Sequence, residues 1–229
     1  MFKIDVLASS SAGNCYVISK GDRHFMIECG IPFREISKKM LKLGLNFNQI
    51  DFCLVSHYHQ DHAASVKDIK RSGIMVIGPE NVAVSKAAKD SEYINLHPYS
   101  ILPFKVIHGE CNCLGYLIKF EDECLMFATD CRLIEMNLKP ANIKQMMIEC
   151  NYLDSKLNIE SLREKRQLNT HMGLNGCITH IEKFKTDSLK EIYLLHMSAK
   201  YGDTIACQSL VEVTTGIKTY VALEKGGIC

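Results

Sequence analysis

Short apolar runs separated by turn residues dominate the first third of the chain, a pattern typical of strands joined by tight turns. We expect an antiparallel meander formed by residues 2–9, 14–19 and 24–30. The next segment instead repeats apolar residues every three or four positions between a Pro and a Gly. This spacing predicts a helix over residues 32–44 that leads into a buried strand at 52–56.

Helical and strand-like patterns then alternate to the last residues. Helices are predicted near residues 64–72, 81–89, 156–168, 174–184 and 204–215. Strands are predicted at residues 74–78, 104–110, 146–150, 192–196 and 218–223, with a hairpin at 114–130. This order favours an α/β (α+β) fold with two packed sheets covered by outer helices over one doubly wound parallel sheet. No linker, repeat or low-complexity tract divides the sequence, so we expect one domain spanning residues 1–229.

Composition places the chain among soluble globular proteins. Hydrophobic residues make up 47% of the sequence and charged residues 23%, which is enough apolar material for a sizeable core. No apolar window reaches the ~18 residues needed to cross a bilayer, and the start lacks a secretory-signal pattern. We therefore expect a cytoplasmic protein with no membrane contact. The 11 cysteines are dispersed and lie mostly in strand-like runs, which indicates reduced, buried thiols.

The overall charge is nearly balanced. Lys plus Arg total 27 and Asp plus Glu total 26, so net charge neither requires nor excludes a polyanionic partner. Two predicted helices carry basic clusters: Arg34, Lys38, Lys39 and Lys42 on one, and Lys156, Arg163, Lys165 and Arg166 on the other. Both helices also bear acids, so a solvated face is favoured over a nucleic-acid contact.

Four strand-like runs lead directly to a side chain that can bind a metal. These side chains are His57, His108, Asp130 and His196. Strand ends in a layered α/β fold gather along one rim, so residues far apart in sequence can meet in a pocket there. A lone histidine at a strand end is more often a structural residue, but the cluster around His57 changes that balance.

The stretch His57-Tyr58-His59-Gln60-Asp61-His62 offers imidazoles and a carboxylate in two directions from one tight loop. Such a loop suits two metal ions better than one. Zinc takes imidazole and carboxylate ligands, and manganese tolerates more oxygen, so two Zn²⁺ or Mn²⁺ ions are expected. Paired metals can share a bridging hydroxide, which would be the nucleophile of a hydrolase.

The motif His57-x-His59-x-Asp61-His62, followed in order by His108, Asp130 and His196, resembles the metallo-β-lactamase fold of binuclear hydrolases. The resemblance implies a four-layer αββα sandwich with the metals at one edge of its two sheets. It assigns His57, His59 and His108 to the first metal, Asp61, His62 and His196 to the second, and Asp130 to both. Asp61 is thereby also expected to be essential for turnover.

Asp130 indicates the kind of hydrolase. Lactam-cleaving members of the best-known subclass place a cysteine at this position, whereas here Asp130 ends the strand and Cys131 follows it. A phosphodiesterase or thioesterase type of site is therefore favoured.

Further stretches resemble the WalJ/YycJ-like branch, whose members are DNA-processing exonucleases. They are residues 6–18 (VLASSSAGNCYVI), 129–131 (TDC), 148–152 (IECNY), 169–176 (NTHMGLNG) and 194–198 (LLHMS). The chain departs from that branch at Tyr152, and in the stretch Thr170-His171-Met172-Gly173, where the branch has G-H-x-S-N and the asparagine here comes later, at Asn175. The resemblance implies that His171 contacts the scissile phosphate, where it would stabilise charge or protonate the leaving group. The alternative is a histidine that packs locally at a helix start.

Other polar residues have two interpretations each. Ser9, Ser10, Ser11 and Asn14 either form hydrogen bonds near the metal rim or make an ordinary turn. Glu149 and Asn151 either orient a ligand histidine or cap the next segment, and capping is slightly favoured.

Three functions remain in competition. The first is a metal-dependent phosphodiesterase acting on nucleic acid, DNA favoured, as a 5′ to 3′ exonuclease that uses the bridging hydroxide. The second is a small-molecule metallohydrolase that cleaves a cyclic phosphodiester, a thioester or a lactone. The third is a non-enzymatic DNA-binding or scaffold protein on a degenerate site.

Overall fold

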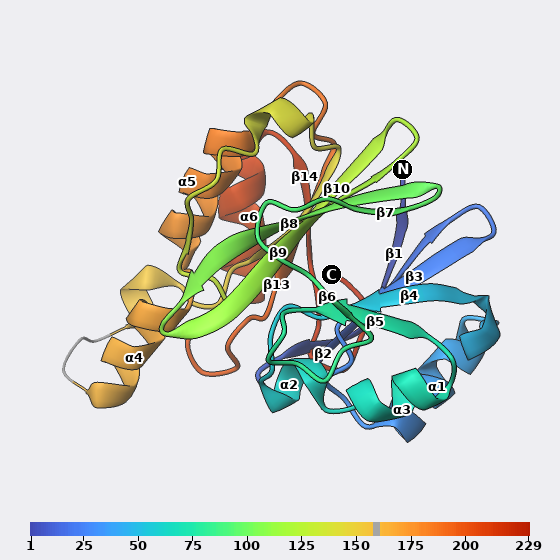
Figure 1. The fold of residues 1–229 in the computed structure, drawn as a ribbon. Coiled ribbons are helices and arrows are strands. Elements are labelled where there is room, and N and C mark those ends of the chain that lie inside the picture. The colour runs from blue at the N-terminus through green and yellow to red at the C-terminus, as the bar shows by residue number, and fades with distance from the viewer. Residues whose placement is uncertain (158–160) are drawn as a thin grey trace.

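Two β-sheets pack face to face in the computed structural model, which describes residues 1–157 and 161–229 (Figure 1). The first sheet has the strand order β1-β2-β3-β4-β5-β6. Its strands are β1 (Lys3–Ser10), β2 (Gly13–Lys20), β3 (Arg23–Ile27), β4 (Ile50–Leu54), β5 (Met75–Gly78) and β6 (Lys86–Ala87). β1, β2 and β3 pair antiparallel, which confirms the expected meander, and β3, β4 and β5 run parallel.

The second sheet has the order β11-β8-β9-β10-β12-β13-β14, with β7 paired to β8. Its strands are β7 (Ile94–Leu96), β8 (Tyr99–His108), β9 (Cys111–Phe120), β10 (Glu123–Ala128), β11 (Leu133–Ile134), β12 (Gln145–Glu149), β13 (Glu191–Leu195) and β14 (Lys218–Val221). The strands from β8 to β10 form antiparallel hairpins, and β10, β12, β13 and β14 are parallel. The parallel strands therefore end on the same side of the molecule.

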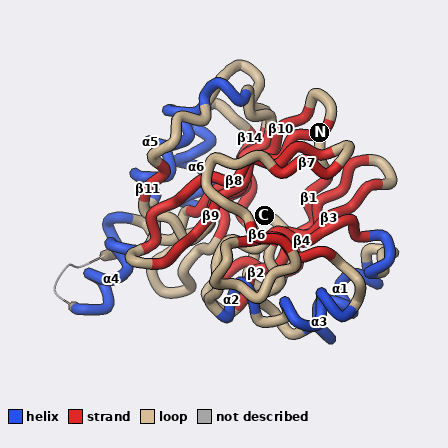
Figure 2. Tube along the Cα trace, in the orientation of Figure 1, coloured by secondary structure: helices blue, strands red, loops and turns tan. Residues whose placement is uncertain are grey.

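Helices cover both outer faces, as Figure 2 shows by colour. They are α1 (Phe33–Lys42), α2 (Gln60–Ala63), α3 (Val66–Arg71), α4 (Leu162–Thr170), α5 (Leu174–Phe184) and α6 (Thr204–Thr215), with 3-10 turns at Phe47–Gln49, Lys139–Ala141 and Asp154–Lys156. α1 and α3 lie on the first sheet, and α5 and α6 lie on the second (Figure 1). The four-layer αββα sandwich is thus confirmed.

Alternation along the strands builds the layers. In β2, Tyr16 and Ile18 face the core between the sheets, and Cys15 and Val17 face the helices outside. Because both faces of the strand are covered, nearly every residue of β2 is buried. On α1, Ile36 and Met40 are buried one turn apart against that same outer face.

Two of the expected helices need correction. The helix predicted near residues 81–89 is wrong, because Ser85 N–H and Ala88 N–H donate to Val76 and Gly78 carbonyls at 2.8 and 2.7 Å. The edge of β5 satisfies this backbone, so it forms β6 instead. The helix predicted at 156–168 begins only at Leu162, and its residues 158–160 lie outside the described chain. The short strands β7 and β11 were not expected.

Within the described residues, no helix has the length and apolarity that crossing a membrane requires.

Candidate metal centre

The loop after β4 carries the first four candidate ligands. His57 follows the strand at its carboxyl end, and the single turn of α2 carries Asp61 and His62 back toward it. Ala63 N–H donates to the His59 carbonyl at 2.9 Å, which closes that turn. His57 and His62 are fully buried.

Gly30 holds this loop in place from the segment that leads from β3 to α1. A Cβ atom at Gly30 would lie 1.7 Å from the Asp61 carbonyl oxygen and 2.6 Å from His62 N. The neighbouring Cys29 N–H donates to the His62 carbonyl at 2.9 Å. Only a residue without a side chain allows the two backbones to approach this closely.

The candidate ligands fall into two groups that share Asp130. Within each group, one ligand atom from every residue lies within 4.8 Å of the others. The first group is His57, His59, His108 and Asp130, and the second is Asp61, His62, Asp130 and His196. The structure therefore brings together all seven candidate ligands predicted from the sequence, in the two groups that the resemblance implied. That they bind metal stays a prediction.

The two oxygens of Asp130 face different groups. Oδ2 lies 3.4 Å from His108 Nε2 and 3.8 Å from His57 Nε2. Oδ1 lies 3.3 Å from His62 Nε2 and 3.2 Å from His196 Nδ1. This is the arrangement expected of a carboxylate that bridges two cations.

The donor set fits divalent metal ions. Asp130 Oδ1 is buried and has no hydrogen-bond partner among the described residues, a cost that a bound cation would remove. Burial, together with the nearby His62, lowers the pKa of His57 to about 2, which keeps it in the neutral form that binds metals. Burial disfavours charge on His196 as well, but Asp130 and Asp61 raise its pKa to about 10. The carboxylates of the second group thus attract a positive charge.

Two of the candidate ligands have unusual backbone angles. Asp130 has φ of +45° and His196 has φ of +54°, in the left-handed region that residues with side chains seldom adopt. Each such residue costs of order 1–2 kcal/mol. The surrounding sheets hold these two strand ends in place, and the two side chains meet, with Asp130 Oδ1 3.2 Å from His196 Nδ1.

Partner groups orient the ligand imidazoles. His57 Nδ1 contacts Ser56 Oγ at 2.9 Å, and His108 Nδ1 donates to the Thr170 carbonyl at 2.8 Å. His62 Nδ1 faces Glu28 Oε1 at 3.4 Å. Such contacts fix which ring nitrogen is left for a metal.

Glu28 was missed at the sequence level. It is fully buried, and its carboxylate also accepts the Ser56 N–H at 3.1 Å. Its signal in the sequence is an acid placed directly after the apolar run of β3. A buried carboxylate needs a partner, so its position alone pointed to a nearby cation or donor.

Glu149 and Asn151 orient His196 rather than only capping the next segment, which corrects the preference taken from the sequence. Glu149 Oε1 lies 3.2 Å from His196 Nδ1, and its Oε2 accepts the backbone N–H groups of Cys131 and Met172. Asn151 Nδ2 donates to the His196 carbonyl at 2.7 Å.

His171 lies beside both groups. Its Nδ1 is 2.7 Å from Glu149 Oε1, and its ring centroid is 5.2 Å from that of His108 and 5.3 Å from that of His196. Burial opposes its charge, but the Glu149 carboxylate raises the pKa of His171. Asp130, Glu149, His171 and His196 also form a third set close enough for one ion. His171 is therefore placed either for contact with substrate or for metal binding.

The N-terminal turn reaches the rim as well. Ser9 Oγ accepts the His196 N–H at 2.9 Å, and Asn14 Nδ2 donates to the Asp61 carbonyl at 3.1 Å. Ser11 lines the cavity at the site. The rim interpretation of this stretch is thus supported by its contacts, except that Ser10 bonds within its own turn.

A cavity of about 290 Å³ opens at the two groups. Its walls include His59, Asp61 and His171, and it extends to Arg163 and Arg166 on α4. Cys131, by contrast, belongs to the core under α5 and α6. Of the basic residues named from the sequence, only these two arginines line the cavity.

Comparison with known proteins agrees with this geometry. The sequence model of the Metallo-beta-lactamase superfamily matches residues 10–107, which include the loop from His57 to His62. The metallo-beta-lactamase fold protein YhfI from Bacillus subtilis superposes with a TM-score of 0.77 at 16% identity, over 100% of this chain and 98% of that chain. This chain has the metallo-beta-lactamase fold. A diphosphatase of the PhnP family superposes with a TM-score of 0.69 at 16% identity, over 99% of this chain and 96% of that one.

A curated relative of this metallo-beta-lactamase-fold chain is Exodeoxyribonuclease WalJ from Streptococcus pneumoniae. The two are 25% identical over 93 residues, which is 41% of this chain and 34% of that protein. The match thus spans about a third of the relative's length. The fold that the resemblance implied is confirmed, whereas the exonuclease branch stays a prediction.

Proposed function

We propose that this chain is a two-metal hydrolase of phosphodiester bonds that acts on DNA ends with 5′ to 3′ polarity. The observation that carries the proposal is the bridging position of Asp130, with one oxygen toward each histidine group. An oxygen ligand at this point suits harder divalent ions than a thiolate does, and such ions act on phosphoryl groups. Cys131, the alternative ligand, is buried in a separate core.

The first ion would be held by His57, His59 and His108, the second by Asp61, His62 and His196, and both by Asp130. When bound, a pair of divalent ions supplies Lewis acidity and a nucleophile usable at neutral pH. Ser56, Thr170, Glu28 and Glu149 keep the imidazoles aligned through their second nitrogens.

His171 would work on the substrate itself. Glu149 engages its Nδ1, so Nε2 is the nitrogen left for a substrate atom in the cavity. A protonated His171 donates to a phosphoryl oxygen or to the departing oxygen as the phosphorus–oxygen bond breaks. General acid catalysis of this kind contributes roughly 10²–10⁴-fold to a rate.

The relatives support a phosphorus-containing substrate. WalJ is described as an exodeoxyribonuclease, and one solved structure of the same fold is described as a diphosphatase. The second candidate is a small-molecule phosphodiesterase. It is favoured by the cavity itself, because about 290 Å³ is near the lower end of the ~300–1,000 Å³ of small-ligand sites.

The test is a hydrolysis screen with metal-free protein reconstituted with Zn²⁺ or Mn²⁺. Its substrates are DNA labelled at the 5′ or the 3′ end, a bis-aryl phosphodiester, a cyclic nucleotide, a thioester and a lactone. We expect stepwise shortening of DNA from the 5′ end and cleavage of the bis-aryl ester. If the protein cleaves neither DNA nor the bis-aryl ester, the proposal is overturned. If it cleaves only the cyclic nucleotide, the second candidate is favoured.

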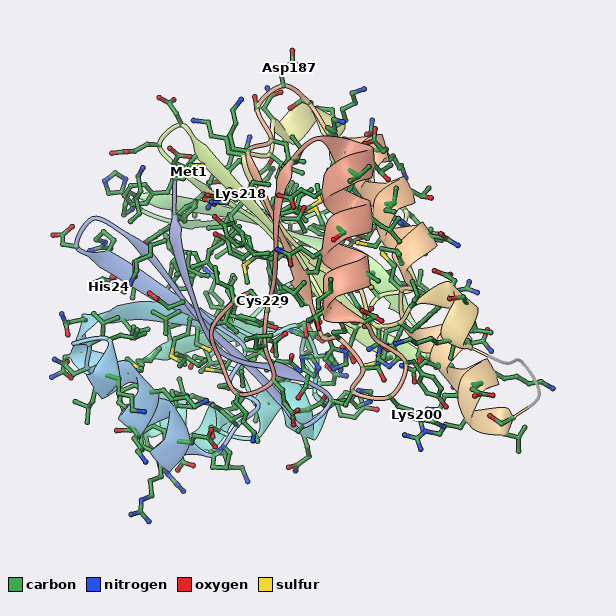
Figure 3. All side chains as sticks on the ribbon, turned by 180° about the vertical axis from the view of Figure 1, so that it is seen from behind. Met1, His24, Asp187, Lys200, Lys218 and Cys229 are labelled. Atoms are coloured by element: carbon green, nitrogen blue, oxygen red, sulfur yellow. The ribbon has the colours of Figure 1, made fainter. Side chains whose placement is uncertain are left out.

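A matched pair of variants tests whether the activity belongs to this site. Asp61→Asn removes one candidate ligand charge and should abolish turnover. Asp187→Asn makes the same change in an exposed turn at the far end of the molecule (Figure 3) and should leave turnover unchanged. Equal activity in the two variants would assign the hydrolysis to a contaminant.

A further inference from the structure

The cavity at the metal centre continues onto one face of α4. Arg163, Arg166 and Thr170 all line it. Residues three and four positions apart share a helix face, so these side chains form one row. With a rise of 1.5 Å per residue, Arg166 lies about 6 Å and Arg163 about 10 Å from Thr170 along the helix axis.

α4 is fixed to the metal centre at its carboxyl end. The Thr170 carbonyl accepts the Nδ1–H of His108 at 2.8 Å. Gln167 Nε2 donates to Asn151 Oδ1, and Asn151 in turn holds His196. The row of arginines therefore has a set position relative to the candidate ligands.

The other end of α4 is anchored too. Ser161 Oγ accepts the Glu164 N–H at 3.1 Å and caps the helix. Tyr201 Oη donates to Glu164 Oε1 at 3.2 Å, from the loop in which Figure 3 labels Lys200. α4 projects from the rest of the molecule, as Figure 1 shows, and these contacts fix the position of both of its ends.

The guanidinium groups of the two arginines are positively charged and exposed. Over the part of the chain that the structure describes, neither guanidinium forms an ion pair with a carboxylate. Lys156, in contrast, pairs with Asp203 at 3.2 Å, and Lys39 pairs with Glu35 at 3.2 Å. Guanidinium groups bind phosphate through two parallel hydrogen bonds, which suits a row that leads away from a phosphoryl site.

Because the cavity is small, a long substrate must extend beyond it. Its volume of about 290 Å³ can enclose the end of a strand but not several nucleotides. The phosphate that follows the reacting one would lie toward the α4 wall of the cavity, where Arg166 and Arg163 supply positive charge.

We propose that Arg163 and Arg166 bind the phosphate adjacent to the scissile one, so that the substrate is a DNA strand with at least two consecutive phosphates. This inference rests on the proposed function of the metal centre. It assigns the specificity for polymer over small phosphodiester to α4.

The test compares two double variants with the same loss of charge. Arg163→Gln/Arg166→Gln removes the row, and Arg34→Gln/Lys38→Gln removes two exposed charges from α1, on the opposite sheet. Binding of a fluorescent single-stranded oligodeoxynucleotide to the full chain is measured by anisotropy in chelator, across a range of salt concentrations. Hydrolysis of the same oligonucleotide and of a bis-aryl phosphodiester is measured with metal restored.

We expect the α4 variant to bind the oligonucleotide about tenfold more weakly or worse, with a salt slope reduced by about 0.7, because one phosphate contact is lost. Its kcat/KM for the oligonucleotide should fall by a similar factor, and that for the bis-aryl ester should stay within twofold. The α1 variant should match the unmodified protein in all assays.

Four results overturn the inference: no DNA binding by the unmodified protein, unchanged binding by the α4 variant, equal weakening in the α1 variant, or an equal loss of bis-aryl hydrolysis. DNA binding that depends on the arginines, without hydrolysis of any phosphodiester, would instead refute the proposed function and leave the arginine site standing.

Discussion

Replacing Gly30 with alanine should remove metal from the protein while leaving it folded. The new Cβ atom would lie 1.7 Å from the Asp61 carbonyl oxygen, 2.1 Å from the Asp61 carbonyl carbon and 2.6 Å from His62 N. These are backbone atoms, which cannot rotate away. Ordinary contact begins near 3.4 Å, so one of the two segments must move by about 1.7 Å.

That displacement is large on the scale of metal coordination. Ligand distances in protein metal sites hold to within about 0.2 Å, so a shift of the Asp61–His62 backbone by several times this amount disrupts the second group. Overpacking of a tight site costs typically about 1–3 kcal/mol. In a chain of this size that lowers the Tm by roughly 2–12 °C, which leaves a folded protein at room temperature.

The assay is metal content by mass spectrometry after reconstitution and desalting, with the Tm measured on the same samples. Gly44→Ala is the matched control. Gly44 has φ of +75°, and no atom lies within 4 Å of the position that an added Cβ would take. Alanine there therefore costs about 1–2 kcal/mol of backbone strain without touching the loop. A full complement of metal in Gly30→Ala would refute the reasoning, and so would equal metal loss in Gly44→Ala.

Three further outcomes are expected. His171→Ala should lower turnover and leave the metal content normal. The control is His24→Ala, on β3 and bonded to Ser19, which should change neither turnover nor metal content. Loss of metal in His171→Ala would make His171 a ligand. Glu28→Ala should weaken binding of the second ion by roughly 10–100-fold in a metal titration, because His62 loses its orienting carboxylate; unchanged affinity contradicts this role. Chelation should lower the Tm without unfolding the chain, and metal at about 100 times its Kd should restore about 2.7 kcal/mol; outright unfolding at room temperature would show that the metals rather than the sheets carry the fold.

The sequence predicted the elements wherever one segment decides its own structure. The helices at Leu174–Phe184 and Thr204–Thr215 begin and end where the apolar spacing placed them. The helix predicted near residues 81–89 is wrong because the edge of β5, just before it in the chain, satisfies the backbone of this segment. Its structure depends on a partner strand rather than on its own residues.

For the candidate site, the sequence by itself determined the ligand types and the strand ends that carry them. His57, His108, Asp130 and His196 each follow a buried run, and strand ends in a layered fold meet at one rim. That conclusion needs only the local pattern and a general rule of topology.

Tertiary structure alone decided which groups face one another. It turned one oxygen of Asp130 toward each histidine group, placed Glu28 behind His62, and set the exposed α4 arginines at the mouth of the cavity. The apolar periodicity of a segment specifies the face of its helix or strand on which a residue lies. It does not specify which residue of another element lies opposite that face. The opposing residue is fixed by long-range packing of the two sheets and their helices, which no single stretch of sequence contains.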